Sequence, residues 1–216
     1  MRRLRLTACL CLVLPGSVAA AEVAVQVEDA RGRPAADAVV TVVPDGEPAK
    51  AAAPPPATRF IDQRDETFIP YVEVFRPGDS VVFRNSDKTR HHAYSFAPAK
   101  AFEFVLGPGE KSSPLVLEKP GVVAVGCNIH DRMITYLFVS AAPYVAKTGA
   151  DGRAIVADLP PGAYTVHVWH PQLRPGAEGF AQPVKFADAG EHRAVSATLA
   201  LIPDPRLQAD REKARY

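Results

Sequence analysis

The feature that most limits the fold of this chain is a succession of short runs rich in β-branched and aromatic residues. Turns containing Gly or Pro separate these runs, and the 216 residues include 21 prolines and 14 glycines. No stretch between residues 59 and 140 shows a sustained helical period. Many short strands at close spacing predict an all-β domain over residues 59–142, folded as a Greek-key sandwich or barrel.

The first 21 residues have the organisation of a secretory signal peptide. Three arginines precede an apolar stretch over residues 8–14, and a run of small residues follows at 19–21. The apolar stretch is too short for a permanent transmembrane helix. We therefore expect cleavage after Ala20 or Ala21 and an exported, periplasmic protein that is soluble and has no membrane span.

Charge and cysteine content narrow the function classes. The chain has 25 Lys and Arg against 24 Asp and Glu, and three of the arginines lie in the signal, so the mature net charge is −2. No basic stripe favours nucleic acid. Outside the signal, Cys127 is the only cysteine and Met133 the only methionine. A disulfide within the mature chain is excluded, and a bound metal would protect the lone thiol.

Cys127 and Met133 lie on one short loop that reads C-x-x-H-x-x-M, with His130 between them. Runs typical of β-strands precede and follow this loop, at residues 119–125 and 134–139. A thiolate, a thioether and two imidazoles form the ligand set of a mononuclear electron-transfer copper site. The second imidazole is available from either His91 or His92.

Strand parity favours His92 as that ligand. Successive side chains on a strand point to opposite faces. Tyr94 and Phe96 are the large apolar residues after the histidine pair, so we expect them to face the interior together with His92. His91 remains the alternative, and whichever histidine is not the ligand is expected at the surface or behind the ligands.

Residues 78–85, the histidine pair and residues 120–133 together resemble the cupredoxins, and in particular the plastocyanin- and amicyanin-like methylamine-utilisation proteins. The resemblance implies one type 1 (blue) copper bound by His92, Cys127, His130 and Met133. It implies a one-electron carrier with no catalytic residues, and thus no enzyme.

Because His130 lies on the loop, we expect redox partner proteins to dock near it, on an apolar rim that includes Leu106, Pro108 and Ile134. The carrier is expected to be a monomer.

The remaining segments carry no comparable chemistry. Residues 143–202 resemble the carboxypeptidase regulatory-like (transthyretin-like) domains, which implies a second, small β-sandwich. Residues 22–58 read as a strand pair followed by a Pro-rich linker, and the strand pair could echo that domain or complete either sandwich. Residues 203–216 form a charged tail.

Two other functions stay open. One is a periplasmic copper carrier or sensor without electron transfer, and the other is a structural or carbohydrate-binding β-protein in which the Cys-His-Met pattern is coincidental. An oxidase is excluded because the chain lacks the separated H-x-H pairs of a trinuclear cluster. A binuclear copper site is excluded because it needs two cysteines.

Overall fold

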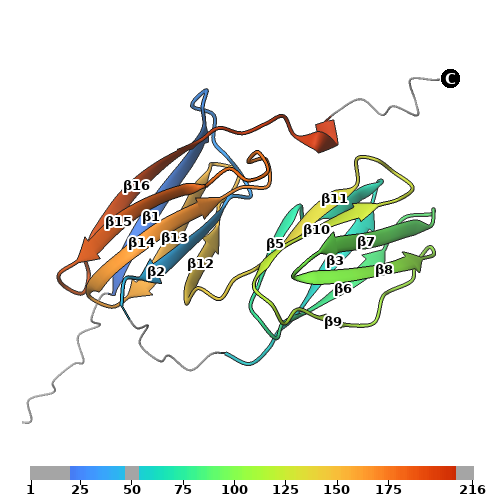
Figure 1. Cartoon of the computed structure of the whole chain (residues 1–216), viewed down its shortest axis with the longest axis horizontal. Coiled ribbons are helices and arrows are strands. Elements are labelled where there is room, and N and C mark those ends of the chain that lie inside the picture. Colours follow the sequence, from blue (N-terminus) through green and yellow to red (C-terminus); the bar gives the residue numbers. More distant parts are fainter. Residues whose placement is uncertain (1–19, 47–53, 208–216) are drawn as a thin grey trace, which may run out of the picture.

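The computed structural model describes residues 20–46 and 54–207, and it shows an all-β protein made of two sandwiches (Figure 1). This confirms the predicted fold class. Among the described residues, helical structure is confined to one 3-10 turn, Pro205–Leu207. No helix within those ranges has the length and apolarity needed to cross a membrane. The signal at residues 1–21 lies almost entirely outside the described residues.

The central sandwich is formed by two sheets from the middle of the chain. The five-stranded sheet has the order β5-β11-β10-β7-β8 and the four-stranded sheet the order β4-β3-β6-β9. Their bounds are Thr58–Arg64 (β3), Thr67–Ile69 (β4), Val72–Phe75 (β5), Ser80–Asn85 (β6), His91–Ala97 (β7), Lys100–Leu106 (β8), Leu115–Val116 (β9), Gly121–Cys127 (β10) and Ile134–Val139 (β11).

The core between these sheets includes three fully buried phenylalanines, Phe68, Phe75 and Phe83. Phe68 and Phe83 meet edge to face, with ring centroids 6.2 Å apart. Cys127 and Met133 belong to the same buried cluster, at the end of the core where β10 and β11 meet. The metal-binding motif is therefore anchored in the hydrophobic core.

The run from Phe68 to Phe75 is divided between the two sheets. β4 pairs with β3 in one sheet, whereas β5 pairs with β11 in the other. The division falls at Pro70 and Tyr71, where the proline has no N–H to donate to a sheet ladder. The chain uses this interruption to cross from one layer to the other.

The flanking sandwich combines the two ends of the chain. Its sheets have the orders β13-β1-β16 and β12-β2-β14-β15. The bounds are Ala21–Asp29 (β1), Val39–Pro44 (β2), Tyr144–Lys147 (β12), Arg153–Leu159 (β13), Gly162–Trp169 (β14), Phe180–Phe186 (β15) and His192–Leu199 (β16). The early strand pair thus completes this sandwich, because β1 pairs with β13 and β16 while β2 pairs with β12 and β14.

The two sandwiches meet through aromatic side chains. Trp169 of β14 packs against Tyr136 and Phe138 of β11, with ring centroids 5.9 and 5.1 Å apart. Beside them, the Arg206 guanidinium lies 3.4 Å from the centre of the Tyr71 ring. Because β11 begins directly after Met133, the flanking sandwich packs on the strand that leaves the metal-binding motif.

Candidate metal centre

The C-x-x-H-x-x-M motif forms the connection between two paired strands. β10 ends at Cys127, β11 begins at Ile134, and these strands pair antiparallel along their length (Figure 1). The Cys127 N–H donates to the Met133 carbonyl at 3.1 Å, and the Met133 N–H donates to the His130 carbonyl at 3.1 Å. These bonds fold the loop back on itself, so that residues three apart in sequence lie together.

Three atoms of types that can ligate a metal converge at this loop. The Cys127 sulfur lies 3.9 Å from Nδ1 of His91 and 3.9 Å from Nδ1 of His130. All three atoms lie within 4.8 Å of one another. The centroids of the two imidazole rings are 5.0 Å apart. His91 begins β7, whereas His130 lies on the loop between β10 and β11. The structure thus brings two predicted site residues, Cys127 and His130, together with His91, the alternative to the predicted ligand His92.

His91, and not His92, points into the interior beside the sulfur. His91, Ala93 and Ser95 are buried, whereas Phe96 is 79% exposed. The prediction that Tyr94 and Phe96 face the interior is therefore wrong. Ala93 and Ser95 fill the space under β10, and the larger rings lie on the outer face of β7. His92 shares that outer face, and its Nε2 has no hydrogen-bond partner among the described residues.

Asp87 fixes the orientation of the His91 ring. The Nε2 atom of His91 lies 2.8 Å from a carboxylate oxygen of Asp87. If Nε2 donates this hydrogen bond, Nδ1 carries the free lone pair, which faces the Cys127 sulfur. A carboxylate behind a ligating histidine is the usual way in which proteins set the tautomer and basicity of a metal ligand.

Asp87 is itself held by a network that sequence patterns do not reveal. Its carboxylate accepts the backbone N–H groups of Asp65 at 2.6 Å and Glu66 at 3.1 Å. Burial alone would raise the pKa of Asp87, but the hydrogen bonds from His91 and from these two N–H groups outweigh it and lower the pKa. The backbone N–H of Asp87 donates to the buried Asn85 side chain, which also donates to the Thr89 and Leu106 carbonyls.

Met133 and His130 occupy opposite environments. Met133 is 1% exposed and lies in the same core cluster as Cys127. The His130 side chain is 21% exposed, and its Nε2 lies 3.7 Å from a carboxylate oxygen of Glu66. Its neighbour Ile129 is 44% exposed. The centre is therefore buried on the Met133 side and open to solvent at the His130 edge.

The apolar rim expected near His130 is only partly at the surface. Leu106 is 5% exposed, because it ends β8 facing inward and joins the central core. Pro108 is exposed and Ile134 is half-buried. Ile129, which the sequence reasoning did not place in this rim, exposes more apolar side chain next to the histidine.

The spacing of the three atoms can be compared with what a metal ion requires. An ion bonded to sulfur at about 2.3 Å and to nitrogen at about 2.0 Å, in a trigonal arrangement, holds those two atoms about 3.7 Å apart. Both observed separations are 3.9 Å. The donor set fits a single soft cation.

No protein-family model matches the sequence, and a search of curated proteins also finds no match. Among solved structures, a Cu-containing nitrite reductase from Thermus scotoductus SA-01 aligns at 29% identity over 45% of this chain and 25% of its own, with a TM-score of 0.34. A purple cupredoxin from Nitrosopumilus maritimus aligns at 21% identity over 38% of this chain and 98% of its own, with a TM-score of 0.34.

Amicyanin from Paracoccus versutus aligns at 14% identity over 46% of this chain and 98% of its own, with a TM-score of 0.35. These alignments each cover less than half of this chain. The assignment of the site therefore rests on its own geometry.

Proposed function

We propose that this chain is an exported one-electron carrier that holds a single copper ion with His91, Cys127, His130 and Met133. The observation that carries the proposal is the convergence of two imidazole nitrogens on one buried sulfur, each at 3.9 Å. His91 takes the place that strand parity gave to His92. In this proposal the protein is not an enzyme, and it transfers single electrons between redox partners.

Copper bound by this donor set supplies a centre that accepts and releases one electron. Cys127, His91 and His130 would hold the ion, and the Met133 thioether would be the weaker donor that tunes its potential. Cys127 would hold the ion as a thiolate.

The surroundings suit a rigid site. His91 is fully buried and held by Asp87, and Cys127 is 6% exposed in the core. Ligands that cannot move keep one geometry in both oxidation states, which lowers the reorganisation that accompanies electron transfer. The partly exposed His130, next to Ile129, is the proposed point at which redox partners dock.

Electrochemistry tests this function against its closest alternative. We expect copper-loaded protein to show a reversible one-electron couple and fast self-exchange. A copper carrier or sensor would bind the metal with the same stoichiometry but show slow or irreversible electron exchange. If the protein does not take up one equivalent of copper, both the electron carrier and the copper carrier or sensor are excluded. A structural β-protein then remains.

A further inference from the structure

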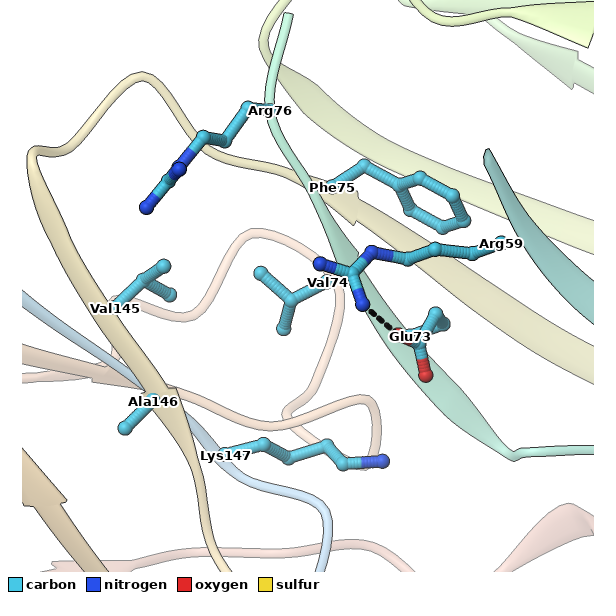
Figure 2. A pocket seen from close by; sticks show the side chains of 8 residues that line it. All are labelled: Arg59, Glu73, Val74, Phe75, Arg76, Val145, Ala146 and Lys147. Carbon is cyan, nitrogen blue, oxygen red and sulfur yellow. Dashed lines mark hydrogen bonds and ion pairs between the residues drawn. The ribbon is translucent and has the colours of Figure 1, made fainter. Parts of the chain in front are cut away.

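Two sheet edges face each other where the sandwiches meet. β5 is the last strand of the five-stranded sheet, and β12 is the last strand of a sheet in the flanking sandwich. Figure 2 shows the cavity between them, of about 260 Å³, lined by Arg59, Glu73, Val74, Phe75, Arg76, Val145, Ala146 and Lys147. We call this cavity the edge groove. Lys147 bridges it, because its Nζ donates to the Val72 carbonyl at 2.6 Å.

Backbone groups of both strands point into the edge groove. The carbonyls of Tyr71, just before β5, and of Phe75, at its end, accept hydrogen bonds from the N–H groups of Tyr136 and Ser140, so these positions face β11. The alternation of a strand turns the N–H and C=O of Val74 the other way, toward the groove.

The same alternation applies to β12. The Thr148 N–H donates to the Ala38 carbonyl on the β2 side, so the backbone of Val145 and Lys147 faces away from β2. Two strand edges, each able to pair with another strand, therefore border one cavity.

The lining of the edge groove has more cations than acids. Arg59, Arg76 and Lys147 contribute three cations against one acid, Glu73, which lies 3.3 Å from Arg59 (Figure 2). Lys147 also pairs with Asp37 at 3.2 Å. Among the described residues, no acid pairs with the Arg76 guanidinium, which Figure 2 shows beside Val145. Val74, whose side chain projects into the middle, makes that part apolar.

We propose that the edge groove binds an extended acidic segment of a partner protein, in which carboxylates flank an apolar residue. Backbone N–H and C=O groups of the segment pair with the backbone of Val74 on β5 and of Val145 on β12, which is the β-augmentation mode of peptide recognition. The Val72 carbonyl keeps its hydrogen bond from Lys147. One carboxylate lies against Arg76. The other lies against Arg59 or Lys147, where it competes with Glu73 or Asp37. Its apolar side chain packs on Val74.

The test uses a labelled peptide of alternating Glu and Val, titrated into the full purified chain and followed by fluorescence anisotropy. We expect saturable binding that weakens with added salt, since exposed charge pairs are screened. Arg76→Glu should weaken binding by about tenfold or more, which corresponds to about 1.4 kcal/mol. Lys185→Glu makes the same charge change at an exposed position of β15, away from the groove, and should leave binding unchanged.

A second peptide separates strand pairing from simple charge attraction. The same sequence with methylated backbone nitrogens keeps its carboxylates but cannot donate to a strand edge, and it should bind at least about tenfold more weakly. Equal binding of the two peptides overturns the proposal, as does equal weakening by both charge variants. Absence of saturable binding to the folded chain overturns it as well. None of these outcomes depends on copper.

Discussion

Replacing each histidine of the pair in turn distinguishes the two possible ligands. His91→Gln removes a nitrogen that lies 3.9 Å from the Cys127 sulfur, whereas His92→Gln changes a side chain on the opposite face of β7. Loss of a residue that only supports a metal ligand already costs about 10–100-fold in affinity. We therefore expect His91→Gln to weaken copper binding by more than about 100-fold, or about 2.7 kcal/mol, and His92→Gln by less than about twofold.

The measurement is a competitive copper titration of both variants against a chelator of known affinity. His91→Gln also leaves the Asp87 carboxylate without its imidazole partner, and a hydrogen bond to a charged group contributes about 1.5–3 kcal/mol. Urea unfolding of the metal-free variants must accompany the titration, so that lost affinity is not confused with lost fold. Copper kept by folded His91→Gln and lost by His92→Gln would contradict ligation by His91.

Three further perturbations test other parts of the structure. Met133→Leu should keep copper and raise the reduction potential, and a lowered potential in voltammetry would contradict axial ligation by Met133. Trp169→Ala should destabilise the chain by about 2–3 kcal/mol in urea, below the range of about 3–5 kcal/mol for buried aromatics, because the ring is only partly buried; no change would mean that the sandwiches do not pack through it. Burial alone would raise the pKa of Asp204, but the hydrogen bonds from Arg206 outweigh this effect, so the pKa is lower than its ordinary value. The pair's stabilisation, about 0.5–1 kcal/mol, is therefore present above the ordinary pKa of 3.8 and lost as the pH falls through the lowered value. Asp204→Asn should be less stable than the parent at neutral pH and equal to it in acid, and an unchanged difference in acid would contradict this.

Local sequence patterns predicted the parts of the site that depend on neighbours in the chain. Cys127, His130 and Met133 share one loop between two strands, so their proximity follows from a few residues of spacing. The choice between His91 and His92 failed because it assumed that the larger rings of β7 point inward. The core beside Cys127 has room for Ala93 and not for Phe96, and that space is set by strands distant in sequence.

Contacts between segments that are distant in the sequence could not be predicted either, because local patterns do not show which strands pack together. Asp87 supports His91, but its place is fixed by the backbone of Asp65 and Glu66, which no motif connects to it. β1 pairs with β13 and β16 across more than a hundred residues, so alternation alone could show that it is a strand but not which sandwich it completes.

Ligation of copper by Cys127 can be measured in the visible absorption spectrum of the copper(II)-loaded protein, recorded beside that of Cys127→Ser. Charge transfer from a thiolate to copper predicts an intense blue band in the parent, at one copper per chain. The band should vanish in the serine variant while circular dichroism shows that the β-structure is retained. A copper-loaded parent without this band, or a serine variant that keeps it, would contradict ligation by the Cys127 sulfur.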